Sequence, residues 1–319
     1  MRLKLVRDET HIDFIGFWKI AGAFSITAII ASVAVFLIMG LNFGIDFRGG
    51  VTIEVRTEGP ADLGQVRGIV GNLDLGDVSV QEFGQPEDVL IQVEVQQGDG
   101  NVQQAVVSAV KAALDAEIAN VEYRRVEVVG PKVSGELIQA GITAIVLAIM
   151  AVLFYIYIRF EWQFSVGAVA ALVHDVVLTI GVFSVMQLGF NLSIIAALLT
   201  IVGYSLNDTV VVFDRVRENL RRFKTKALVD VLNLSINETL SRTIMTSVTT
   251  LIALLSLYFL GGEVIQGFTF GMIWGVLVGT YSSVFVASVV LKKLGVKRDW
   301  SKPDPEGPAG VQFGSADAP

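Results

Sequence analysis

The stretch LSIIAALLTIVGYSLNDTVVVF, residues 192–213, is almost entirely apolar and long enough to cross a bilayer as one helix. A single carboxylate, Asp208, interrupts it. On insertion scales, a charged Asp at the centre of a membrane helix costs roughly 2.5 to 3.5 kcal/mol, and such residues usually serve a function. Nearby apolar stretches contain His174, Asp175 and Arg242, so this charge does not stand alone. The sequence therefore predicts a membrane bundle that moves protons, ions or a polar substrate.

The whole chain has the composition of an α-helical membrane protein. Of its 319 residues, 53% are hydrophobic, which is above the usual range for soluble domains. The first apolar stretch is longer than the core of a signal peptide, which favours an uncleaved anchor. Six stretches approach or exceed the roughly 20 residues that span hydrocarbon, namely residues 20–41, 137–158, 162–186, 192–213, 243–260 and 268–291.

The placement of Lys and Arg predicts the orientation of these spans. With a cytoplasmic N-terminus, 17 of the 24 basic residues lie on the inner side, and the other seven lie between the first two spans. Both termini are then cytoplasmic. The net charge of −7 mostly reflects an acidic outer segment and tail, and it gives no reason to expect nucleic-acid binding. The absence of cysteine excludes disulfides and thiol chemistry.

These features divide the chain into five predicted units. They are a cytoplasmic N-terminus (1–19), a first span (20–41), a polar outer domain (42–134), a bundle of five further spans (135–292) and a disordered cytoplasmic tail (293–319).

The outer segment reads as one small α/β domain. Alternating apolar residues and turn signals predict the order β-α-β-β-α-β, with strands at 51–55, 78–83, 89–95 and 121–129 and helices at 61–73 and 101–118. This order is the ferredoxin-like pattern. The fold hosts many functions, and the segment shows no catalytic constellation, so a binding or docking module is expected.

Asp208 and Arg242 are the first pair of candidate site residues. Each lies 17 residues from Thr225, the expected apex of a helical hairpin, so both are predicted at similar depth. Two alternatives stay open. Asp208 can hydrogen-bond its neighbours near the cytoplasmic interface, five residues before Phe213, and Arg242 can extend to the lipid headgroups.

His174 and Asp175 lie near the middle of the third span, where they are the deepest charges by counting. They are candidates for a proton relay, with a purely structural pair as the alternative. Adjacent residues on a helix point about 100° apart, so we expect that they do not both face one small site.

Gly267, Gly271, Gly275 and Gly279 form an unbroken stripe at every fourth residue of the last span. Small residues at this spacing allow two membrane helices to approach closely. The stripe predicts a tight helix partner, either in this chain or in another subunit.

Four segments of the chain resemble the SecF family, the smaller membrane subunits of bacterial SecD–SecF protein-export complexes. The resemblance runs from the first span to the sixth and depends on these segments together. They are NFGIDFRGG (42–50), ALVHD (171–175), GYSLNDTVVVFDR (203–215) and NETLSRT (237–243).

The resemblance implies half of a bundle of the resistance–nodulation–division type, six transmembrane helices with a ferredoxin-like periplasmic domain between spans one and two. It implies a multi-pass protein of the bacterial inner membrane that uses the proton-motive force to promote late export of polypeptides. Asp208 and Arg242 match the family's proton pathway, and Asp175 lies in a family motif. The implied partners are a SecD-like subunit, the Sec translocon channel, the translocating preprotein and membrane lipid. No enzymatic activity, metal or cofactor is implied, and protons are the coupling ion.

Three alternatives remain at this stage. A proton-driven exporter of small molecules or lipids shares the machinery, but such pumps usually have larger outer domains. An intramembrane aspartyl protease would use Asp175 and Asp208, although its usual motifs are missing here. A structural scaffold for the translocon is the third alternative.

Overall fold

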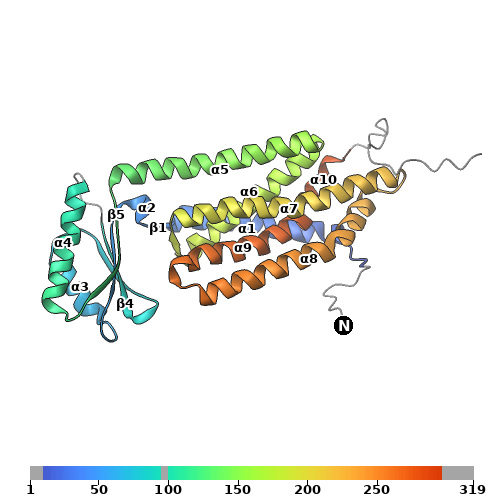
Figure 1. Ribbon diagram of the computed structural model, residues 1–319. Coiled ribbons are helices and arrows are strands. Elements are labelled where there is room, and N and C mark those ends of the chain that lie inside the picture. Colours follow the sequence, from blue (N-terminus) through green and yellow to red (C-terminus); the bar gives the residue numbers. More distant parts are fainter. Residues whose placement is uncertain (1–9, 95–99, 297–319) are drawn as a thin grey trace, which may run out of the picture.

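The computed structural model describes residues 10–94 and 100–296, and it consists of a long helical bundle with a small α/β domain at one end (Figure 1). Residues 1–9 and the predicted tail from residue 297 onward lie outside the described residues. Within these described residues, six helices are long and apolar enough to cross a membrane. The first span joins the turn η1 (Ile15–Phe17) to α1 (Trp18–Met39), and the next four spans are α5 (Pro131–Arg159), α6 (Trp162–Met186), α7 (Leu192–Arg222) and α8 (Leu228–Leu260). The sixth span follows the short turn η2 (Glu263–Ile265) and consists of α9 (Gln266–Ser282), η3 (Ser283–Ala287) and α10 (Ser288–Leu294).

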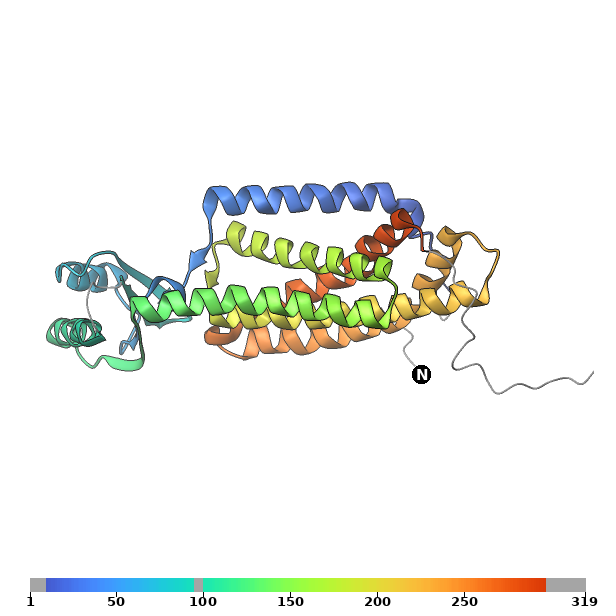
Figure 2. The same ribbon diagram turned by 90° about the horizontal axis from the view of Figure 1, so that it is seen from above.

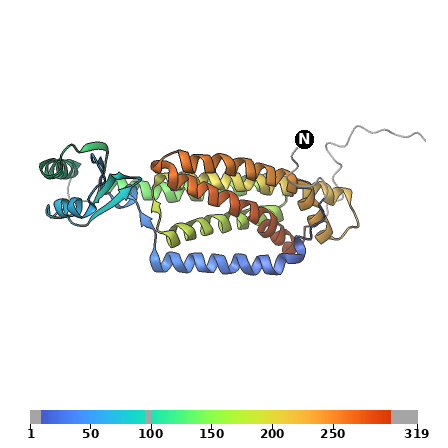
Figure 3. The ribbon, with the colours of Figure 1, turned by 90° about the horizontal axis from the view of Figure 1, so that it is seen from below.

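The six spans form an inner and an outer set. In the most apolar 18 residues of each span, the buried share is 61%, 44% and 56% for α6, α7 and the sixth span. The corresponding shares for α1, α5 and α8 are only 6%, 6% and 11%. Helix α1 runs along one edge of the bundle beside α6, and α8 lies at the opposite side (Figures 2 and 3). The inner set is therefore where buried polar groups can be held, and the outer set leaves most of its apolar side chains exposed.

Helices α7 and α8 are longer than the apolar pattern predicts. The stretch predicted to end at residue 213 continues to Arg222, and the span predicted to begin at residue 243 begins at Leu228. The reason is that both helices extend beyond the apolar zone as polar, amphipathic turns. At 1.5 Å per residue, Asp208 lies about 24 Å and Arg242 about 27 Å from the outer ends of their helices. Asp208 is thus in the middle of its helix and not near its end.

The outer domain contains a four-stranded antiparallel sheet with both helices packed on one face (Figure 1). Its apolar core lies between the sheet and those helices. The sheet order is β3-β4-β2-β5, and the elements are β2 (Gly50–Arg56), α3 (Leu63–Gly71), β3 (Val78–Phe83), β4 (Gln85–Val93), α4 (Gly100–Glu117) and β5 (Glu122–Val129). The element order is the predicted one. Strand β4 begins four residues earlier than expected, because Gly84, at φ +86°, makes the reversal almost alone.

The segment 42–50 attaches this domain to the bundle. Strand β1 (Asn42–Phe43) pairs in parallel with β6 (Gly189–Phe190), in the loop between α6 and α7. In the following turn α2 (Ile45–Arg48), Asp46 accepts a hydrogen bond of 2.8 Å from the Leu192 amide at the start of α7. Phe47 is buried in a cluster with Phe190 and other residues of that end of the bundle. The outer domain is therefore tied to the outer end of α7 by backbone pairing, a helix cap and a buried ring.

Candidate functional site

The centre of the bundle holds a fully buried carboxylate, Asp175 on α6. Its Oδ2 accepts hydrogen bonds from the hydroxyl of Ser205 on α7 at 2.6 Å and from that of Ser282 on α9 at 2.8 Å. Both serines are also buried. Because a buried carboxylate is costly unless its oxygens are hydrogen-bonded, these two hydroxyls are what allow Asp175 to lie there. One side chain thus joins the three inner helices.

His174 belongs to the same cluster, contrary to our expectation that adjacent residues would face different sites. Its Nδ1 lies 2.9 Å from Asp175 Oδ1. The Cα–Cβ bonds do diverge, but rotation about χ1 and χ2 brings the imidazole back toward the neighbouring carboxylate. The ring stacks on Tyr281 at a centroid distance of 5.9 Å, and the buried Nε2 has no hydrogen-bond partner among the described residues.

Ser282, which the sequence analysis did not identify, lies at a change of helix type. The α-helix α9 ends at Ser282, and the next five residues form the π-helical segment η3. Such π-helical segments are rare in proteins, and those that do occur frequently lie at functional sites. The available signal was the polar run TYSS at 280–283 inside an otherwise apolar span. No periodicity predicts the π-helix itself.

Asp208 is 3% exposed, and its Oδ2 is buried without a hydrogen-bond partner among the described residues. Arg242 is exposed on α8 and interacts electrostatically with Asp208. No ion pair of 4.0 Å or less joins the two among the described residues. The hydroxyl of Tyr204, one turn before Asp208, is buried and likewise without a partner there. The structure brings Asp208 within electrostatic range of Arg242 and leaves one oxygen of Asp208 without a hydrogen bond among the described residues.

Helix α8 carries threonines at helical spacing, among them Thr239 and Thr246. Thr239 and Thr246 donate to carbonyls of their own helix, as threonines in membrane helices often do. The polar contact between α8 and the sixth span is made instead by Ser247 and Thr280, whose hydroxyls lie 2.7 Å apart.

The glycine stripe packs against α7 of this same chain. A Cβ built on Gly267 or Gly271 would make ordinary contacts, with Ile194 or with Phe183 and Ala197 respectively. A Cβ at Gly275 would overlap the Ile201 side chain. At Gly279 the Cβ of Ser205 would be 3.0 Å away, so this glycine allows the close approach that brings Ser282 and Ser205 to one carboxylate.

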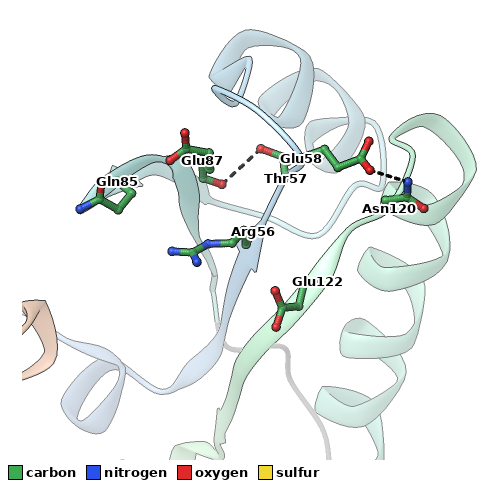
Figure 4. A pocket seen from close by; sticks show the side chains of 7 residues that line it. All are labelled: Arg56, Thr57, Glu58, Gln85, Glu87, Asn120 and Glu122. Atoms are coloured by element: carbon green, nitrogen blue, oxygen red, sulfur yellow. Dashed lines mark hydrogen bonds between the residues drawn. The ribbon is translucent and has the colours of Figure 1, made fainter.

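The outer domain contains a separate polar cavity of about 520 Å³ at one end of the sheet (Figure 4). Asp88, beside it, forms an ion pair with Arg56 at 2.5 Å. The hydrogen bond from Arg56, together with the positive charges of Arg56 and Arg124, lowers the pKa of Asp88 despite its burial. Among the described residues, no group of three or more His, Cys, Asp or Glu side chains could hold a metal ion. The cavity is lined by Arg56, Thr57, Glu58, Gln85, Glu87, Asn120 and Glu122.

Comparison with protein families gives two matches that together cover most of the chain. Residues 109–297 match a family described as the C-terminal part of the protein export membrane proteins SecD and SecF. Residues 34–61 match the SecD/SecF GG motif, which includes the whole attachment segment at 42–50.

Curated relatives match over nearly their full length. The protein translocase subunit SecF of Rhodobacter capsulatus is 50% identical over 317 residues, which is 95% of each chain. The SecF subunit of Cereibacter sphaeroides is 47% identical over 323 residues, which is 99% of each chain.

Two solved structures share the fold. The crystal structure of SecDF, a translocon-associated membrane protein from Thermus thermophilus, matches with a TM-score of 0.81 at 31% identity. A super-membrane-facing form of SecDF matches with a TM-score of 0.67 at 32% identity. In both cases the match covers 92% of this chain but only 40% of the solved chain.

Proposed function

We propose, from the premise that this chain belongs to the SecF family of protein translocase subunits, that it uses the proton-motive force to promote late export of polypeptides. The family is one of non-catalytic accessory membrane proteins. In this proposal the chain resides in the bacterial inner membrane with both termini in the cytoplasm. The outer domain, of the ferredoxin-like class, then lies in the periplasm and contacts the emerging preprotein. Its strand order supports that class.

The observation that carries the proposal is the state of Asp208. A carboxylate in the middle of a membrane helix, buried and with an unbonded oxygen, is expensive as an anion. Arg242 nearby makes the anion less costly. Protonation removes the charge, so occupancy by a proton alters how strongly α7 and α8 attract each other. This is the property that a proton-coupled site needs.

A partner subunit completes the site in this proposal. Asn207 and Arg242 are exposed at the middle of α7 and α8, where lipid would otherwise surround them. Polar side chains at that depth almost always face protein or a water-filled cavity. The solved SecDF chains are about two and a half times as long as the segment that matches this one. We assign the protein surface that covers Asn207 and Arg242 to a SecD-like subunit, and we expect that subunit to contribute a carboxylate of its own.

The coupling proceeds in four steps. Protonation of Asp208 weakens its attraction to Arg242, α7 and α8 repack, α7 shifts, and the outer domain follows through the Asp46 cap and the β1–β6 pair. Each proton that crosses about 150 mV supplies roughly 3.5 kcal/mol. That energy can bias a two-state element by a few hundredfold.

The test is Asp208→Asn, which removes the charge and preserves the shape. In membrane vesicles that contain the translocon, its ATPase and the SecD-like partner, we expect loss of proton-driven late export, while ATP-driven initiation persists. Asp214→Asn is the matched control, because Asp214 is an exposed carboxylate on the same helix whose ion pair with Arg159 contributes little. Wild-type late export by the Asp208 variant would disprove the proton-site assignment.

A further inference from the structure

The Asp175 cluster has no part in the coupling steps described above, yet both oxygens of its carboxylate have hydrogen-bond partners. Its carboxylate accepts two hydroxyl hydrogen bonds and contacts His174, and all four side chains are buried. One of those hydroxyls belongs to Ser205, three residues before Asp208 on α7. The cluster therefore holds α7 less than one turn away from the proposed proton site.

We infer that Asp175 is a positioning residue, whose carboxylate fixes the rotation of α7 against α6 and α9 through Ser205 and Ser282 and thereby holds Asp208 beside Arg242. This inference rests on the proposed function for the role of Asp208. The geometric part, that Asp175 sets the rotation of α7, is independent of it.

The first support is the shortness of the side chains involved. A serine hydroxyl is one carbon away from the backbone, so a hydrogen bond of 2.6 Å to Asp175 leaves α7 little freedom to turn. Residues 205 and 208 are about 4.5 Å apart along the axis and about 60° apart around it. A rotation that breaks the Ser205 bond therefore also carries Asp208 away from its position. Ser205 is held from the other side by Gly279, where there is no room for a larger side chain.

The second support concerns the direction of the hydrogen bonds. Ser205 and Ser282 both donate to Asp175, and Asp208 Oδ2 has no hydrogen-bond partner among the described residues. No described hydrogen-bond chain therefore connects Asp175 to Asp208. The titratable groups around the cluster are His174 on α6, Tyr281 on the sixth span, and Tyr204 and Asp208 on α7. This arrangement favours a role in positioning over transfer of a proton between the two carboxylates.

The experiment compares Asp175→Asn with Asp175→Leu. Asparagine keeps the size of the side chain and one oxygen that can accept hydrogen bonds from both serines. Its amide cannot bind and release a proton as a carboxylate does. Positioning predicts that Asp175→Asn retains proton-driven export within about threefold of wild type, whereas Asp175→Leu loses most of it. A relay predicts that Asp175→Asn is as inactive as Asp208→Asn, and that result would overturn the inference.

A second measurement follows the helix itself. The chain has no cysteine, so spin labels on Trp162→Cys and Glu218→Cys, both exposed, report the distance between α6 and α7. We expect Asp175→Leu to shift this distance and Asp175→Asn to leave it unchanged. An unchanged distance in the Leu variant would overturn the inference whatever the export rate.

The milder variant Ser205→Ala covers the case in which Asp175→Leu does not fold. It removes one hydrogen bond, and we expect it to change the pH dependence of export, because Asp208 is less well placed. A mere loss of folded protein would scale the rate equally at every pH, and that outcome would contradict positioning. If Asp208→Asn exports normally, the proposed function fails, while the spin-label distances still decide whether Asp175 sets the rotation of α7.

Discussion

At the scale of single residues, Asp208 and Arg242 differ in how this chain accommodates them. Asp208 is buried and Arg242 is exposed, with no close ion pair between them among the described residues. Charges that share a site without direct contact still couple in a medium of low dielectric constant. Asp208 and Arg242 lie about 24 Å and about 27 Å from the outer ends of their helices, so the similar depth predicted from the sequence agrees with the structure.

We expect this coupling to appear in a double-mutant cycle on the export rate. Asp208→Asn and Arg242→Gln together should depart from additivity by about 0.5–3 kcal/mol, the usual range for interacting sites. Asp208→Asn with Arg217→Gln is the control, because Arg217 lies near the inner end of α7 and contacts the Arg159 carbonyl. Strict additivity of the first pair would mean that Arg242 only extends to the headgroups.

The Asp88 pair gives a pH prediction for the outer domain. The Arg56 hydrogen bond lowers the pKa of Asp88 below its ordinary value of 3.8, so the folded domain favours the carboxylate. This contribution to stability is fully present above pH 3.8 and is lost as the pH falls through the lower, folded pKa. Urea unfolding between pH 2 and 7 should show that loss, and Asp88→Asn should flatten it. Glu127→Gln, in an exposed pair with Arg125, should leave the curve nearly unchanged.

At the scale of elements, apolar runs and alternation predicted the six spans and the four strands and two helices of the outer domain, but not β1, α2, β6 or η3. The apolar runs located all six spans, but the polar ends of α7 and α8 were missed because their amphipathic turns are not hydrophobic. Asp208 and Asp175 were recognisable because charge is rare in membrane helices. Ser282 was not, because a serine in an apolar span becomes informative only when the fold shows which carboxylate it meets.

The glycine stripe allows a prediction about helix packing. Gly275→Ala should lower the thermal stability of the purified protein, because the new methyl group overlaps Ile201, a buried and β-branched side chain with little room to move. Overpacking of this kind typically costs about 1–3 kcal/mol. Gly271→Ala is the matched control, since its methyl group would make contacts of 3.4–3.5 Å. An equal loss in both variants would show that the effect is one of glycine removal and not of the α7 contact.

At the scale of the whole molecule, two separate cores meet at a narrow junction. The outer domain has its own apolar cluster, while Phe47 of the attachment segment belongs to a cluster of the bundle. Among the described residues, the segment 42–50 and the chain from β5 into α5 link the two. Figure 1 shows these connections on the side of the sheet opposite α3 and α4. This arrangement suits a domain that moves as a rigid body on the end of α7.

Such a division predicts that residues 50–130 fold without the bundle. The fragment retains the complete sheet, both covering helices and every residue of the buried core cluster, among them Val51, Ile53 and Leu114. We expect a mixed α/β circular-dichroism spectrum and one cooperative unfolding transition. Ile91→Ala, at a fully buried position, should cost about 2–5 kcal/mol, whereas Val128→Ala, at an exposed position, should cost little. An unfolded fragment would mean that the outer domain depends on the membrane bundle for its fold, and the rigid-body movement would then have no basis. Two variants of equal stability would mean that the fragment does not form the packed core around Ile91.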